Sequence, residues 1–141
     1  MRGYTLIEML VALVIVSVVA TSVALALPDP LPTQQSASVR AWQKEAQALS
    51  SRAMAEGRVL GWAIDERRAT PVAGEGPRAA LELAPGLVVE AVEVEGARLP
   101  LPAHIRFSEV PVLFVIRVTG GERRWQLASR PSGAIDLVGP P

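Results

Sequence analysis

A long, largely apolar run lies near the N-terminus of the chain. Nineteen consecutive positions, Met9 to Leu27, carry no charge, and Glu8 is an acid at the start of this run. An α-helix rises about 1.5 Å per residue, so a helix of this length matches the roughly 30 Å hydrocarbon core of a bilayer. The run ends at three closely spaced prolines (Pro28, Pro30 and Pro32). The pattern predicts a membrane-spanning helix followed by a proline-rich hinge over residues 28–35.

A second helix with a different pattern follows the prolines. Its apolar residues recur at alternating spacings of three and four, with charged and amide side chains between them (Val39, Trp42, Ala46, Leu49 and Ala53). This spacing predicts an amphipathic helix of about five turns that buries one stripe. Ser36 or Ser38 is the expected N-cap and Gly57 the expected C-cap. Trp42 is expected to anchor the core.

After Gly57 the period of the pattern changes to two, which is typical of strands. The expected strands are Val59–Ile64, a weak one at Ala79–Leu83, Leu87–Glu95, His104–Phe107, Val112–Val118, Trp125–Ser129 and Ala134–Val138. Residues 65–68 are expected to form a polar turn, residues 69–78 a loop, and Gly120-Gly121 a hairpin turn. The predicted fold is α+β, with one helix covering a face of an antiparallel sheet in a single domain over residues 36–141.

The composition restricts the kinds of ligand and catalytic site that the chain could have. The 141 residues carry 14 basic and 14 acidic side chains, so no basic excess points to nucleic acid, and no cysteine is present for disulfides, thiol catalysis or metal binding. His104 is the single histidine and is expected at an exposed strand edge. Glu90, Glu93 and Glu95 are expected on a solvated face or charged edge. We therefore expect no catalytic site, no cofactor and no metal centre, and we predict that the chain is not an enzyme.

The residues before the apolar run carry a recognisable signal. Arg2-Gly3-Tyr4-Thr5-Leu6-Ile7-Glu8 resembles the class III signal of type IV pilins and of type II secretion pseudopilins. The resemblance implies that a prepilin peptidase cuts after Gly3 on the cytoplasmic side. Residues 1–3 would be the leader, residues 4–27 the transmembrane and assembly helix, and Tyr4 the methylated N-terminus.

The resemblance also gives Glu8 a role, because it falls on the fifth mature position, where the family has a glutamate. In a filament of packed apolar helices, the amine of Tyr4 would be a cation shielded from water. A carboxylate one turn along a neighbouring helix would neutralise this charge. Two other interpretations of the segment remain open: a secretory signal peptide cut at Ala24-Leu25-Ala26, and a plain membrane anchor. The long apolar run disfavours the signal peptide, and Glu8 disfavours both.

The folded part adds a second resemblance. Glu56-Gly57-Arg58, the strand from Gly61 to Asp65 and the stretch from Val112 to Ile135 are similar to the H-type minor pseudopilins (GspH), which share a domain family with the minor pilins FimT and FimU. Residues 66–109 carry no resemblance and are the expected place for partner specificity. The absence of a cysteine pair and of a clustered aspartate loop disfavours the major pilins and pseudopilins.

These resemblances imply a single-pass protein of the bacterial inner membrane, with a cytoplasmic N-terminus and a periplasmic C-terminal domain. It would be a minor subunit at the junction of tip and shaft in the pseudopilus that supports export of folded proteins. The implied partners are other minor pseudopilins, the major pseudopilin, prepilin peptidase, the inner-membrane assembly platform and the lipid bilayer, with no nucleic acid. The alternatives are a minor pilin of a type IV pilus, a cleaved periplasmic binding protein and a membrane-anchored enzyme.

Overall fold

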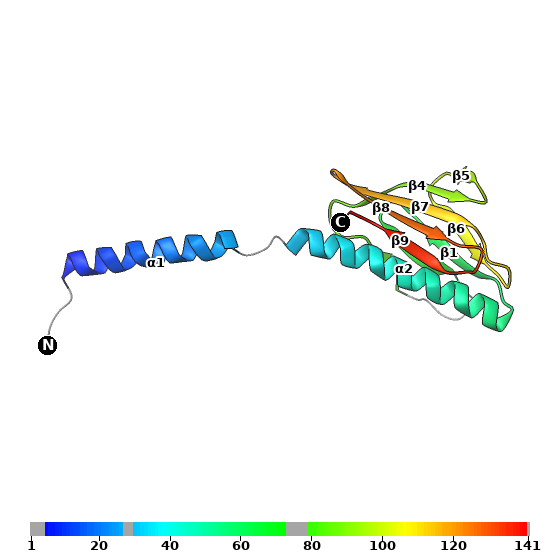
Figure 1. Cartoon of the computed structure of the whole chain (residues 1–141), viewed down its shortest axis with the longest axis horizontal. Coiled ribbons are helices and arrows are strands. Elements are labelled where there is room, and N and C mark those ends of the chain that lie inside the picture. Colours follow the sequence, from blue (N-terminus) through cyan, green and yellow to red (C-terminus); the bar gives the residue numbers. More distant parts are fainter. Residues whose placement is uncertain (1–4, 27–29, 73–78, 141) are drawn as a thin grey trace. The chain divides into compact units, whose positions relative to one another are not determined.

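The computed structural model describes residues 5–26, 30–72 and 79–140. The chain divides into two compact units, Met1–Pro30 and Leu31–Pro141. The first contains helix α1 (Leu6–Ala26), and the second contains helix α2 (Pro30–Glu56), apart from its first residue, and all the described strands (Figure 1). The described residues thus have the helices and antiparallel strands of the predicted α+β class.

Helix α1 has 21 residues, and up to residue 22 it exposes apolar side chains all round, including Leu6 (87% exposed) and Leu13 (69%). Its hydroxyl groups are satisfied within the helix, because Ser17, Thr21 and Ser22 donate to carbonyl oxygens four residues earlier at 2.7–2.8 Å. Among the residues that the structure describes, no helix combines the length and mean hydropathy of a membrane span. The membrane-spanning role of residues 4–27 stays a prediction.

Helix α2 begins earlier than predicted. It starts at Pro30, so the expected start at Ser36 or Ser38 was too late, and residues 30–35 of the expected hinge are helical; residues 28–29 lie outside the described ranges. Prolines are tolerated in a first turn because the amide groups there have no acceptor within the helix. Ser38 has another task, since its hydroxyl donates to the carbonyl of Gln35 (2.9 Å) and accepts from the amide of Ala84 (3.1 Å).

The strands form two antiparallel sheets, where one was predicted. A four-stranded sheet has the order β3-β2-β1-β6, and a five-stranded sheet has the order β5-β4-β7-β8-β9. Alternation along a strand reveals its two faces but not its neighbours, so the division into two sheets was not predictable from the pattern. The bounds are β1 Leu60–Ile64, β2 Arg68–Val72, β3 Leu81–Glu82, β4 Val88–Val94, β5 Ala97–Leu99, β6 Ala103–Phe107, β7 Phe114–Gly120, β8 Arg123–Ser129 and β9 Ile135–Val138.

Strands β2 and β5 were not predicted from the sequence, whereas the hairpin turn at Gly120-Gly121 was. Strand β2 occupies the first part of the expected loop over residues 69–78, with Pro71 opposite Trp62; residues 73–78 lie outside the described ranges. Strand β5 follows a two-residue turn in which Glu95 and Gly96 both have positive φ (50° and 80°). The predicted hairpin is confirmed, because Gly120 pairs with Arg123 across a two-residue loop.

The core is formed by α2 and the inner faces of both sheets. The predicted stripe is confirmed, since its five members are at most 1% exposed (Val39, Trp42, Ala46, Leu49 and Ala53). Trp42 packs edge-on against Trp62 of β1, with ring centroids 5.8 Å apart. From Trp62 the aromatic contacts continue through Phe107 of β6 to Phe114 of β7, and so they join the two sheets. The C-cap is confirmed as well, with Gly57 at φ 59°.

Candidate assembly segment and domain surfaces

The predicted assembly residue Glu8 lies in the first turn of α1, and its side chain is exposed. Its amide donates to the carbonyl of Thr5 (3.0 Å), as does that of Met9 (3.2 Å), so Thr5 precedes the first helical turn. A carboxylate at this position is favourable because the N-terminus of a helix carries partial positive charge. The two residues predicted for processing, Gly3 and Tyr4, lie outside the described ranges, so the pairing of Glu8 with the Tyr4 amine stays a prediction.

The Thr5-x-x-Glu8 spacing also matches a capping box, in which the two side chains serve the free amides of a helix start. Among the described residues, however, neither side chain makes the hydrogen bond that a capping box requires. Within the described residues, the carboxylate of Glu8 has no hydrogen-bond or ion-pair partner. On an otherwise apolar helix, this charge is therefore available to a partner.

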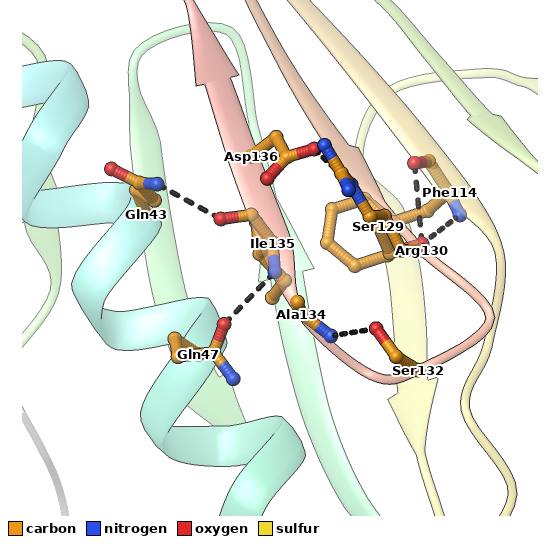
Figure 2. Close-up of polar contacts among 9 residues, drawn as sticks. All are labelled: Gln43, Gln47, Phe114, Ser129, Arg130, Ser132, Ala134, Ile135 and Asp136. Carbon is orange, nitrogen blue, oxygen red and sulfur yellow. Dashed lines mark hydrogen bonds and ion pairs between the residues drawn. The ribbon is translucent and has the colours of Figure 1, made fainter.

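In the second unit, two glutamines of α2 bind the edge of the five-stranded sheet (Figure 2). The side-chain amide of Gln43 donates to the carbonyl of Ile135 (2.9 Å), and the amide of Ile135 donates to Oε1 of Gln47 (2.9 Å). Ile135 opens β9, an outermost strand of that sheet. The two side chains thus occupy the hydrogen-bonding positions that another strand would use, and we call them the glutamine clamp.

The chain just before β9 is held by the same helix. The carbonyl of Gly133 accepts from Gln47 Nε2 and from the Ser50 hydroxyl, both at 3.3 Å. Gly133 has φ 84°, and a Cβ there would lie 2.8 Å from Cε of Met54. The turn before β9 is further closed by an ion pair between Arg130 and Asp136 (Figure 2). These contacts set the position of β9 against α2.

The residues considered for catalysis do not converge. His104 is exposed on β6, an outermost strand of the four-stranded sheet, as predicted. Glu93 pairs with Arg117 at 2.6 Å, whereas Glu95 lies in the tight turn and accepts from the amide of Leu113 (2.9 Å). Glu90 lies exposed where the register of β4 against β7 shifts. Across the described ranges, no three acidic or histidine side chains gather closely enough to hold a metal ion.

A groove of about 570 Å³ lies between the first turns of α2 and the end of the five-stranded sheet. Three basic side chains and no acidic one line it, and we call it the cationic groove. The wall from α2 includes Arg40 and Lys44, and the sheet contributes Arg123. This grouping could not be predicted from the sequence, because Arg123 is far along the chain from Arg40 and Lys44.

The comparisons with known proteins support the N-terminal signal. Residues 1–24 match the family model described as the prokaryotic N-terminal methylation motif. No curated protein and no solved structure matches the chain. The predicted type IV pilin and pseudopilin signal is therefore confirmed, whereas the H-type assignment stays a prediction. The motif is the signal of type IV pilins and pseudopilins, and it implies a membrane-anchored N-terminus, processing by prepilin peptidase and assembly with other pilin-type subunits.

Proposed function

We propose that the chain is an H-type minor pseudopilin of a type II secretion system. The observation that carries the proposal is the methylation motif over residues 1–24, which continues into the apolar helix α1. The second unit supports it, because an amphipathic helix packed on antiparallel sheets is the arrangement that the resemblance implies. The role is structural rather than catalytic: the subunit joins the tip of a periplasmic pseudopilus to its shaft of major pseudopilins.

Before assembly, residues 4–27 are held in the bacterial inner membrane, with the leader in the cytoplasm and the folded unit in the periplasm. The surface of α1 suits this environment, because its apolar side chains point outward and its hydroxyls donate within the helix. A backbone or side-chain donor without a partner would be costly in lipid. The same surface can later pack against the apolar helices of neighbouring subunits.

Assembly depends on Glu8 in this proposal. Once the leader is removed after Gly3, the amine of Tyr4 becomes a cation at the start of an apolar helix. Burying the amine or the carboxylate alone costs roughly several kcal/mol, and pairing the two charges offsets much of that cost. Glu8 of one subunit therefore pairs with the Tyr4 amine of a neighbour while the platform extracts the subunit from the membrane.

The first test is the mature N-terminus. The full chain is produced with a prepilin peptidase, and its N-terminus is determined by sequencing and intact mass. The proposal requires a mature chain that begins at Tyr4 and carries one methyl group, and Gly3→Leu should leave the leader attached. A chain that begins at Leu27 would instead identify a secretory signal peptide and contradict the proposal.

The second test separates a secretion pseudopilus from a pilus. The gene is deleted in its native host, and export of folded proteins and surface pili are measured in parallel. A pseudopilin is required for export but not for pili. The reverse result would identify a minor pilin.

A further inference from the structure

The cationic groove gathers three positive charges around one hollow that no acidic side chain lines. Several arginines of the second unit are paired with acids, as in the contacts of Arg68 with Glu82 (2.8 Å) and of Arg117 with Glu93 (2.6 Å). The three cations of the groove (Arg40, Lys44 and Arg123) are exposed, and none has a hydrogen-bond or ion-pair partner within the described residues. Three unpaired positive charges around one hollow indicate an anionic occupant.

The acids next to these cations in sequence do not line the groove. Glu122 precedes Arg123 but lines the adjoining hollow on the five-stranded sheet, together with Arg124. Glu45 follows Lys44 but is also absent from the lining. The lining instead adds two hydroxyl groups, those of Thr33 and Ser36, which can donate to phosphate oxygens. The groove therefore offers both charge and donors to a phosphate group.

The position of the groove along the chain suggests where that phosphate comes from. Only residues 27–29 separate the end of α1 from Pro30, the first residue of α2. That connection spans at most about 14 Å when extended. Side chains on a helix lean toward its N-terminus, so Arg40 and Lys44 lean toward the end of α2 that follows α1. Long basic side chains of this kind extend readily into a headgroup layer.

We propose that the cationic groove binds the phosphate of an anionic phospholipid while the subunit waits in the membrane. The inference rests on the proposed membrane anchoring of α1. Each basic residue near an anionic bilayer surface contributes about a fivefold preference. Three of them together give a preference on the order of a hundredfold, which extraction into a filament must overcome.

The chain contains no cysteine, so a single reporter can be placed at the groove. Ala37 lines the groove and is exposed, and Ala37→Cys accepts a fluorophore without removing a charge. The labelled full chain is inserted into vesicles of phosphatidylcholine alone or mixed with phosphatidylglycerol. Quenching by a lipid with a spin-labelled headgroup then measures how close the groove lies to the headgroups.

We expect phosphatidylglycerol to increase the quenching and high salt to reverse the increase. The triple variant Arg40→Gln, Lys44→Gln and Arg123→Gln should lose this increase. The matched control removes three exposed arginines elsewhere (Arg67→Gln, Arg98→Gln and Arg106→Gln) and should keep it. Tryptophan fluorescence checks that both variants are folded.

Three outcomes would overturn the inference. One is equal quenching with and without phosphatidylglycerol, and another is equal loss in the two triple variants. The third is quenching that stays independent of anionic lipid while the groove cross-links to an acidic surface of a neighbouring subunit. Extraction of the chain by alkaline carbonate would show that α1 is not inserted, which would overturn the proposed function as well. An inserted chain without lipid-dependent quenching would overturn the inference alone.

Discussion

The glutamine clamp predicts a specific loss of stability when Gln47 is replaced by Met. The substitution keeps the length of the side chain and nearly the same helix propensity, so changes in α2 itself cancel. It removes the acceptor of the Ile135 amide (2.9 Å) and one donor to the carbonyl of Gly133 (3.3 Å). Gly133 keeps the bond from Ser50, so the main cost comes from the Ile135 amide.

The magnitude follows from burial. Ile135 is 5% exposed, and its amide is left without an acceptor beside α2. An unsatisfied buried donor costs about 1–3 kcal/mol, and the weaker bond to Gly133 adds about 0.5–1 kcal/mol. We expect Gln47→Met to lower the free energy of unfolding by about 2–3 kcal/mol. Gln43→Met removes only a donor to the Ile135 carbonyl and should cost about 1 kcal/mol.

Urea denaturation of the full chain in a mild nonionic detergent measures these differences. Intrinsic fluorescence reports on the second unit alone, because all three tryptophans lie there (Trp42, Trp62 and Trp125). Gln34→Met is the matched control, since Gln34 is exposed on the same helix. Hydrogen exchange of the Ile135 amide should accelerate in Gln47→Met and not in the control. Equal stability of Gln47→Met and Gln34→Met, with unchanged exchange, would refute the reasoning.

Three further predictions concern the core, the turn before β9 and assembly. Trp42→Ala should lower the free energy of unfolding by about 3–5 kcal/mol, because a fully buried indole is lost. Trp42→Phe should cost clearly less, because the Nε1 atom that it removes has no hydrogen-bond partner among the described residues. Urea denaturation measures both variants, and a similar loss of stability in the two would show that the indole nitrogen contributes to stability. Gly133→Ala should lower the free energy of unfolding by at least about 1 kcal/mol, because φ is 84° and the new Cβ would press on Met54. At Gly96 (φ 80°) a Cβ meets nothing within 4 Å, so Gly96→Ala should cost less. Equal thermal midpoints for the two variants would contradict this account. Glu8→Ala should leave membrane insertion and cleavage of the leader intact but reduce incorporation into filaments. If the loss of the negative charge causes this effect, Glu8→Gln should reduce incorporation to the same extent. Normal recovery of Glu8→Ala in sheared filaments would exclude the pairing role.

The elements of the second unit that depend on local pattern could be predicted from the sequence. The stripe from Val39 to Ala53 repeats at helical spacing, and each of its members is buried. Gly57 and the hairpin at Gly121 were recognisable because positive φ favours glycine. The alternation in β6 placed His104 outward between the buried residues Ala103 and Ile105. In each case the cause lies within a few residues of the effect.

Other features depend on partners that are distant in the sequence, and these could not be predicted. Gln43 and Gln47 resemble any polar pair on the outer face of a helix, but their shared partner, Ile135, is about ninety residues further along. Pro71 is compatible with a loop in sequence, although it lies in β2 opposite Trp62. The start of α2 was misplaced for a different reason, because prolines both interrupt helices and begin them.

The two helices bury their apolar surfaces by different means, and this difference bears on assembly. Helix α2 buries its stripe in a core that it shares with the sheets of its own unit. Helix α1 exposes apolar side chains on all sides within its unit, and its surface has to be covered by lipid or by other subunits. Moving from one covering to the other exchanges similar apolar contacts, so that step contributes little driving force of its own. Under the two proposals made above, the charges would decide between the two states, with Glu8 favouring a neighbouring subunit and the cationic groove favouring the membrane.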